Sequence, residues 1–213
     1  MKLFSMVVGP IETNCYVVAD GDGNAAVIDP GANGGGIAGR LQEKKLTPKA
    51  ILLTHGHFDH TGGIRAFKRY YPDVPVIVGA NDAPMLADAA SSASVRMYGD
   101  PEDYKGLSAD RTVKEGDEIT VGAMTFSVID TPGHTFGGVC YRCGDLLFSG
   151  DTLFLEEVGR TDLAGGNYDT LLESLKKLAS LPDEVEVFPG HGSPTNMGHE
   201  KKRNMYIRKA LSE

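Results

Sequence analysis

Three of the six histidines in this 213-residue chain lie within six residues, in a His-x-His-x-Asp-His motif at positions 55–60. An apolar, β-prone stretch at residues 50–53 comes directly before the motif, and Ile64 and Phe67 follow it at helical spacing. The sequence therefore predicts that a buried strand ends at the motif and that a helix begins near Thr61. A motif this dense in histidine rarely arises by chance, which indicates a function.

The side chains of this motif indicate a cation site. A neutral histidine offers a lone pair and an aspartate offers an anionic oxygen, a combination that suits zinc best and iron or manganese less specifically. His55 and His57 can face one cation, and Asp59 and His60 on the following turn can face a second. The alternative is a solvated loop with Asp59 as a helix cap, but a cap needs only one such residue.

Three later positions repeat the setting of the motif. Each is a histidine or aspartate just past an apolar strand and beside a glycine: His134 after residues 125–129, Asp151 after residues 146–148 and His191 after residues 185–188. Open α/β sheets usually place their sites where strand ends converge on one edge. We therefore expect these three side chains to join the first cluster.

Strands and helices are predicted along the whole chain, with an Asp-Gly-rich turn at residues 20–24. The further strands expected are residues 3–8, 15–19, 25–28, 74–78, 112–113, 118–121 and 139–141. The helices expected are residues 37–46, 81–94, 168–178 and 197–211, with Asn81 capping the second and Asn167 the third. Glycines 34–36, before the first helix, are predicted not to be helical. Residues 98–106 are expected to form a loop. No linker or low-complexity segment interrupts the chain, so one domain over residues 1–213 is predicted.

Composition narrows the classes of function. Hydrophobic residues make up 41% and charged residues 23%, as in ordinary globular chains, and the net charge of −8 disfavours nucleic-acid or anionic-membrane partners. No stretch has the length of a membrane span, and the N-terminus reads as a strand and turn, not a signal peptide. The three cysteines argue against a secreted disulfide framework, so a cytoplasmic protein is expected. Cys140 and Cys143 are predicted to be structural, since no second pair completes a zinc site, and His199 is expected to be an ordinary helix residue.

The chain resembles the metallo-β-lactamase-fold proteins, in particular the glyoxalase II-like (hydroxyacylglutathione hydrolase-like) hydrolases, over residues 3–204. The motifs that carry the resemblance are residues 55–60, Pro-Gly-His-Thr at 132–135, Ser-Gly-Asp-Thr at 149–152 and Pro-Gly-His-Gly at 189–192. The resemblance implies an α/β fold, an αβ/βα four-layer sandwich of two mixed β-sheets with helices outside. It also implies two divalent metal ions: one held by His55, His57 and His134, one held by Asp59, His60 and His191, and Asp151 bridging them.

The activity implied by the resemblance is metal-dependent hydrolysis of a small-molecule thioester, hydroxyacylglutathione or a related compound. Two ions roughly 3.5–4 Å apart would share a hydroxide as the nucleophile, which Asp59 would orient as the catalytic residue. Thr54, Ser149 and Asp29 are expected to fix the geometry of the ligands. Arg160, in Gly-Arg-Thr-Asp at residues 159–162, meets an anionic substrate group or forms a structural salt bridge; the sequence favours neither.

Other branches of the family fit less well. Asp151 stands where most β-lactamases carry cysteine, His57 stands where flavodiiron oxygen reductases carry glutamate, and the net charge disfavours the RNA-processing branch. Only a short segment follows His191, so the glutathione-gripping helical domain of glyoxalase II is not expected. The alternative activity is that of the persulfide dioxygenases, in which a single iron lies at the positions of His55, His134 and Asp151. A metal-stabilised binding module ranks lower, and the oligomeric state stays open.

Overall fold

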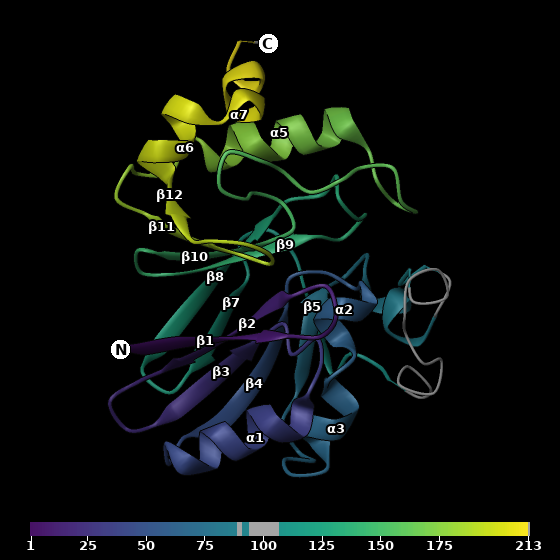
Figure 1. Cartoon of the computed structure of the whole chain (residues 1–213), viewed down its shortest axis with the longest axis vertical. Coiled ribbons are helices and arrows are strands. Elements are labelled where there is room, and N and C mark those ends of the chain that lie inside the picture. The colour runs from purple at the N-terminus through teal and green to yellow at the C-terminus, as the bar shows by residue number, and fades with distance from the viewer. Residues whose placement is uncertain (89–90, 94–106, 213) are drawn as a thin grey trace.

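The computed structural model describes residues 1–88, 91–93 and 107–212. Within these residues, two six-stranded sheets lie face to face, with helices on the outer face of each (Figure 1). The first sheet has the order β1-β2-β3-β4-β5-β6 and the second the order β12-β11-β10-β9-β8-β7. Both sheets are mixed, since β3 to β6 run parallel in the first and β10 and β11 run parallel in the second. The predicted α/β four-layer sandwich is confirmed.

The strands of the first sheet are β1 (Lys2–Val8), β2 (Thr13–Ala19), β3 (Asn24–Ile28), β4 (Thr47–Leu53), β5 (Val76–Gly79) and β6 (Arg111–Val113). Those of the second are β7 (Glu118–Val121), β8 (Met124–Asp130), β9 (Val139–Cys143), β10 (Leu146–Gly150), β11 (Glu186–Pro189) and β12 (Thr195–Asn196). The helices are α1 (Gly34–Glu43), α2 (Phe58–Thr61), α3 (Ile64–Lys68), the 3₁₀ helix η1 (Ala83–Ala87), α5 (Tyr168–Leu178), α6 (Met197–Arg203) and α7 (Met205–Ala210). None of these helices is long and apolar enough to span a bilayer.

Three apolar layers hold the sandwich together, and β2 shows how one strand serves two of them. Val17 packs with α1 and α3, while its neighbours Tyr16 and Val18 pack between the sheets. Successive side chains of a strand point to opposite faces, so a strand that is covered on both sides must be apolar almost throughout. A third layer, which includes Leu175 of α5, lies between the second sheet and helices α5 to α7.

The prediction that glycines 34–36 are not helical was wrong, because α1 begins at Gly34. Asn33 caps the helix by accepting a hydrogen bond from the backbone N–H of Gly36 at 3.3 Å. A Cβ on Gly34 would overlap the carbonyl oxygen of Gly63, in the turn between α2 and α3. The glycine therefore lets the start of α1 pack directly on the segment that follows the histidine motif, and this contact offsets the poor helix propensity of glycine.

Two other predicted helices differ from the structure. In the described part of residues 81–94, the helical segment is only the 3₁₀ helix η1, and its N-cap position is Asp82, not the predicted Asn81. The Asp82 side chain makes no cap, because it accepts hydrogen bonds from other loops. The loop predicted at residues 98–106 lies outside the described residues. The C-terminal helix is divided at Asn204, which is extended and caps α7 by accepting from the N–H of Tyr206 at 2.9 Å.

Candidate metal centre

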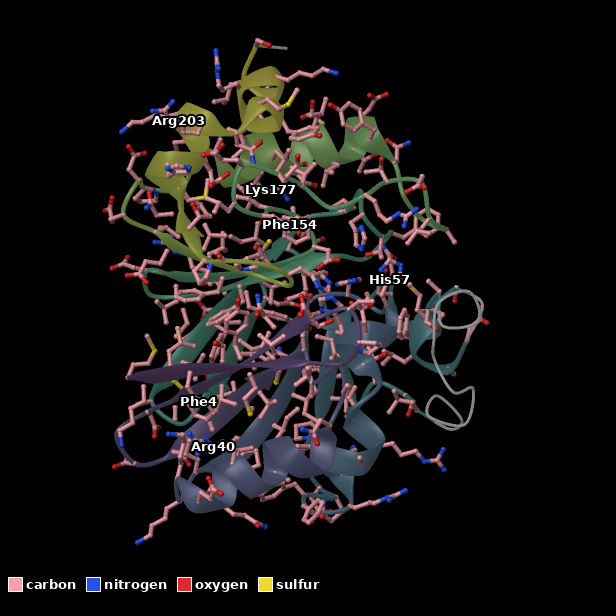
Figure 2. All side chains as sticks on the ribbon, viewed as in Figure 1. Phe4, Arg40, His57, Phe154, Lys177 and Arg203 are labelled. Atoms are coloured by element: carbon pink, nitrogen blue, oxygen red, sulfur yellow. The ribbon has the colours of Figure 1, made fainter. Side chains whose placement is uncertain are left out.

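The seven predicted ligands come from four segments of the chain and lie close together in the structure. One of them, His57, lies beside the region where the two sheets meet (Figure 2). Four of them follow β4, and α2 begins at Phe58, earlier than expected, so that Asp59 and His60 lie on this helix. His134 lies in the loop after β8, and Asp151 and His191 follow β10 and β11. The expected convergence of strand ends is therefore confirmed.

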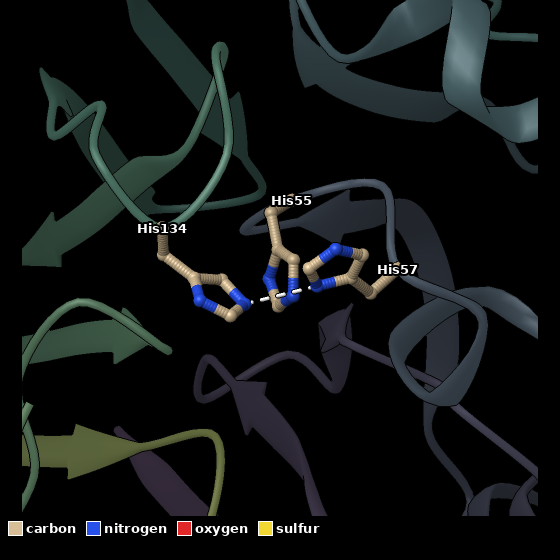
Figure 3. A group of neighbouring side chains, drawn as sticks. All are labelled: His55, His57 and His134. Atoms are coloured by element: carbon tan, nitrogen blue, oxygen red, sulfur yellow. Dashed lines mark hydrogen bonds between the residues drawn. The ribbon is translucent and has the colours of Figure 1, made fainter. Parts of the chain in front are cut away.

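Their ligand atoms form three overlapping groups, within each of which the atoms lie no more than 4.8 Å apart: His55, His57 and His134; His55, His60 and Asp151; and Asp59, His60 and His191. In the first group, His57 Nδ1 lies 2.9 Å from His134 Nε2, and the three rings turn toward one another (Figure 3). In the third, Asp59 Oδ2 lies 3.2 Å from the Nε2 atoms of both His60 and His191.

Asp151 lies between the first and third groups. Its Oδ1 is 3.3 Å from His60 Nε2, and its Oδ2 is 3.5 Å from His134 Nε2 and 3.6 Å from His191 Nε2. One carboxylate thus contacts histidines on both sides, as a bridging ligand would.

The donor atoms of the cluster fit a pair of cations. His55 Nε2, His60 Nε2 and Asp151 Oδ1 are buried without a hydrogen-bond partner among the described residues. In both rings the other nitrogen, Nδ1, already contacts Thr54 or Asp29. A buried polar atom without a partner costs about 1–3 kcal/mol, so several in one place indicate that something else binds them. Histidine nitrogens and carboxylate oxygens are ligands of zinc, iron and manganese, so the cluster fits the dinuclear metal site expected from its sequence, without distinguishing among these metals.

The electrostatics of the two halves differ. Burial lowers the pKa of His55 well below its ordinary value and lowers that of His57 to about 4, so these two rings are neutral and ready to bind a cation. Burial also opposes protonation of His60, but the nearby carboxylates, Asp59 foremost, outweigh it and raise the pKa of His60 well above its ordinary value. The pKa of His191 is raised as well, against burial, by its hydrogen bond to Asp59.

Asp29 and Thr54 contact the ligands as expected. Asp29 Oδ2 lies 2.9 Å from His60 Nδ1, and Thr54 Oγ1 lies 3.1 Å from His55 Nδ1. The hydroxyl of Ser149 instead donates to the carbonyl of Leu153 at 2.8 Å, across the turn that carries Asp151. Ser149 therefore supports the turn and makes no hydrogen bond to a ligand through its hydroxyl.

Arg160 contributes to the centre through its backbone. Its carbonyl oxygen accepts a hydrogen bond from His134 Nδ1 at 2.7 Å, which leaves His134 Nε2 to face the cluster. Its side chain makes two hydrogen bonds of 2.7 Å to the carboxylate of Asp162, the geometry of the predicted salt bridge. Both side chains are exposed.

A cavity of about 470 Å³ opens over the cluster. Five predicted ligands form its floor: His57, Asp59, His134, Asp151 and His191. Apolar side chains form most of its wall: Ile11, Phe58, Ala93, Phe154 and Leu163. Among the described residues that line it, Arg160 is the one with a permanently cationic side chain.

Cys140 and Cys143 are buried free thiols that pack in different apolar layers, one on each face of the second sheet. They cannot share a zinc ion, which agrees with the predicted structural role. His199 lies on α6 and pairs with Glu156 at 2.8 Å, outside the metal centre.

Comparison with known proteins agrees with this geometry. Residues 8–191 match the sequence profile of the family described as Metallo-beta-lactamase superfamily. The chain belongs to the metallo-beta-lactamase superfamily.

Two curated members of the superfamily cover this chain almost completely. It is 40% identical over 97% of its length to the probable metallo-hydrolase YqgX of Bacillus subtilis, of which it covers 98%. It is 32% identical to the hydroxyacylglutathione hydrolase GloC of Haemophilus influenzae, again over 97% of this chain and 98% of that protein. These relatives place the chain among the metallo-hydrolases of the superfamily.

Solved structures of the superfamily have the same fold. BLEG-1, described as a B3 metallo-beta-lactamase, is 38% identical with a TM-score of 0.91, over 97% of this chain and 99% of that one. TTHA1623, solved in a di-iron-bound form, is 38% identical with a TM-score of 0.84, over 95% and 99%. ETHE1 from Myxococcus xanthus is 28% identical with a TM-score of 0.79, over 99% and 90%.

Sequence reasoning missed Asp82, which contacts loops on both sides of the site. It follows β5 at the same sheet edge as the predicted ligands, so the signal that identified them was present there too. Thr13, at the start of β2, also supports the site by donating from Oγ1 to Asp59 Oδ2 at 3.0 Å.

Proposed function

We propose that this chain is a metal-dependent hydrolase of small thioesters, with His55, His57, Asp59, His60, His134, Asp151 and His191 as the ligands of two divalent cations. The observation that carries the proposal is the position of Asp151, between two ligand groups on the floor of a cavity. The described lining residues include no serine, cysteine or lysine that could serve as a covalent nucleophile. The attacking group in this proposal is therefore water.

Divalent cations held by these seven residues would lower the pKa of a bound water toward neutrality and would polarise a substrate carbonyl. Asp59 is the residue that we expect to orient this water. In the metal-free site, burial alone would raise the pKa of Asp59, but the charge of His60 and the hydrogen bond from His191 hold it well below its ordinary value. Bound cations, which would replace these protons, would favour the carboxylate in the same way. The side chain stays a carboxylate and can accept a hydrogen bond from the water. Thr13 fixes the carboxylate by donating to Oδ2.

The type of leaving group follows from the cavity lining. The described lining offers no tyrosine or lysine as a proton donor, and the guanidinium of Arg160 does not lose its proton. A departing thiolate needs little protonation, because thiols have a pKa near 8.5, whereas an amide nitrogen needs a general acid. A thioester is therefore the substrate class that this cavity suits best, as the likeness to hydroxyacylglutathione hydrolase GloC also suggests.

The wall of the cavity favours an apolar group on the substrate. Phe58, Phe154 and Leu163 line it, and the Arg160 guanidinium beside them is already paired with Asp162. Burying an apolar group contributes about 25 cal/mol per Å² of surface. We propose an uncharged, apolar acyl chain in this part of the cavity.

The test is a substrate panel assayed on metal-free protein reloaded with zinc, iron or manganese. The panel holds lactoylglutathione, acetyl and longer acyl thioesters, an amide of matched shape and a β-lactam, since BLEG-1 is described as a beta-lactamase. We expect thioester hydrolysis to exceed amide and β-lactam hydrolysis. His57→Ala should lose metal and activity while it stays folded, and His199→Ala, on α6, is the matched control. Thioester hydrolysis at the uncatalysed rate, or wild-type turnover in His57→Ala, would refute the proposal.

The second candidate is persulfide oxidation at a single iron held by His55, His134 and Asp151. The observation that favours it is the closeness of these three side chains, with Asp151 Oδ2 3.5 Å from His134 Nε2 and the rings of His55 and His134 4.9 Å apart. Iron-loaded protein with glutathione persulfide separates the candidates. Oxygen uptake with one iron per chain supports oxidation, and two ions per chain with no uptake support hydrolysis.

A further inference from the structure

Asp82 is a fully buried carboxylate, and both of its oxygens accept hydrogen bonds. Oδ2 accepts from the backbone N–H of Gly56 at 3.0 Å and from the hydroxyl of Thr135 at 2.7 Å. Oδ1 accepts from the backbone N–H of Gly137 at 2.6 Å. Hydrogen bonds to a carboxylate are stronger than those between neutral groups.

The donors belong to the two loops that carry the three-histidine group. Gly56 stands between His55 and His57, after β4 of the first sheet. Thr135 follows His134 directly, in the loop between β8 and β9 of the second sheet. The Asp82 side chain therefore joins the two loops whose relative position keeps His57 Nδ1 and His134 Nε2 2.9 Å apart.

Glycines stand where the loops touch the Asp82 segment. A Cβ on Gly56 would lie 2.6 Å from Cβ of Met85, in η1. A Cβ on Gly137 would overlap the backbone N of Asp82. Any side chain at either position would push the Asp82 segment away. The two glycines therefore allow both ligand-bearing loops to pack directly against this segment.

We propose that Asp82 is a positioning residue for the first metal site, holding His55, His57 and His134 in binding geometry through Gly56, Thr135 and Gly137. Asp82 contacts the loops and lines no part of the described cavity wall. Its substitution therefore changes the affinity and geometry of the three-histidine site, and any effect on turnover follows from that change. This inference rests on the proposed metal centre.

The test is Asp82→Asn, which keeps the shape of the side chain but turns an NH₂ group toward a hydrogen-bond donor. Asp20→Asn is the matched control, because Asp20 is also buried and joins the two sheets, accepting from Asn24 N and Ala123 N at 2.9 Å. It lies before the start of β3, whereas Asp29, which contacts His60, follows the end of that strand. Three quantities are measured in each variant: zinc affinity by chelator competition, the visible spectrum of bound Co²⁺, and the melting temperature of the metal-free protein.

We expect Asp82→Asn to lose about 10–100-fold in affinity for one of two zinc ions, the range typical of outer-shell partners, and to alter the Co²⁺ spectrum. Asp20→Asn should lower the melting temperature at least as much and leave both metal readouts unchanged. Should Asp82→Asn fail to fold, Thr135→Val removes one of the three contacts, and a smaller loss in the same direction is expected. If Asp82→Asn binds zinc with wild-type affinity and gives the wild-type Co²⁺ spectrum, the role of Asp82 is refuted while the proposed function stands. The same result in Thr135→Val has the same meaning if Asp82→Asn does not fold. A wild type that binds no cation would overturn the proposed function as well.

Discussion

His60 Nδ1 lies 2.9 Å from Asp29 Oδ2, with both side chains no more than 2% exposed. The contact fixes the histidine, because a ring that donates from Nδ1 must present the lone pair of Nε2 to the cluster. Asp29 holds this position with φ at 50°, a left-handed conformation that is uncommon for a residue with a side chain. The same carboxylate accepts from the N–H and hydroxyl of Thr54, at 2.8 and 2.7 Å.

Asp29→Asn should weaken binding of a cation at His60 about 10–100-fold. In either orientation the amide would point its NH₂ group at a donor, from Thr54 or from His60. Isothermal titration calorimetry with zinc measures the affinity. The control is Asp183→Asn, because Asp183 is exposed and forms an ion pair with Lys201. Equal zinc affinities in both variants would contradict the role of Asp29.

Thr13→Val should lower kcat about tenfold, equivalent to about 1.4 kcal/mol, while metal content stays at the wild-type level. Valine keeps the shape of threonine but cannot donate to Asp59 Oδ2, so the carboxylate that orients the water is less well held. Thr152→Val is the control, since its hydroxyl donates to Thr131 at 3.0 Å and not to a carboxylate. An unchanged kcat in Thr13→Val would mean that Asp59 needs no such support.

The metal-free protein should be most stable near pH 6.5. The pKa of His57 is lowered to about 4, so the unfolded chain binds more protons below pH 6.5 and stability falls as the pH falls toward 4. The pKa of His60 is raised, so the folded state keeps its proton above pH 6.5 and stability falls as the pH rises. Saturating zinc replaces protons at the site and should move the pH of maximum stability upward. Urea unfolding from pH 5 to 8.5 gives the free energy of unfolding at each pH, and a metal-free protein whose stability rises over the whole range would contradict this prediction.

Phe154→Ala should raise KM about tenfold for thioesters with long apolar acyl chains and change KM little for acetyl thioesters. The ring lines the cavity, and losing part of a buried aromatic contact costs on the order of 1–2 kcal/mol. Phe136→Ala is the control, because Phe136 is 69% exposed and not among the lining residues. Equal changes in KM for short and long acyl chains would count against an apolar subsite at Phe154.

The sandwich and the convergence of the ligands could be predicted from the sequence because the strands show as apolar runs without any knowledge of their neighbours. His134, Asp151 and His191 each follow such a strand, and strands that run in the same direction end at the same edge of a sheet. Asp29 and Thr54 were predictable because they stand at the ends of neighbouring parallel strands, β3 and β4.

The features that the sequence did not predict depend on contacts between distant segments. The glycines of α1 are helical because Gly34 packs on Gly63. The helix predicted from Asn81 begins instead at Ala83, and the Asp82 side chain before it bonds to Gly56 and Gly137. In both places a tertiary contact outweighs the local preference of the residues, so propensity and spacing indicate the wrong structure.

The central claim is that segments from β4, β8, β10 and β11 hold two cations between them. Anomalous diffraction from crystals of zinc-loaded protein tests it most directly. The account predicts two peaks about 3.5–4 Å apart, one among His55, His57 and His134 and one among Asp59, His60 and His191, with Asp151 in contact with both. A single peak, or peaks away from these side chains, would contradict it.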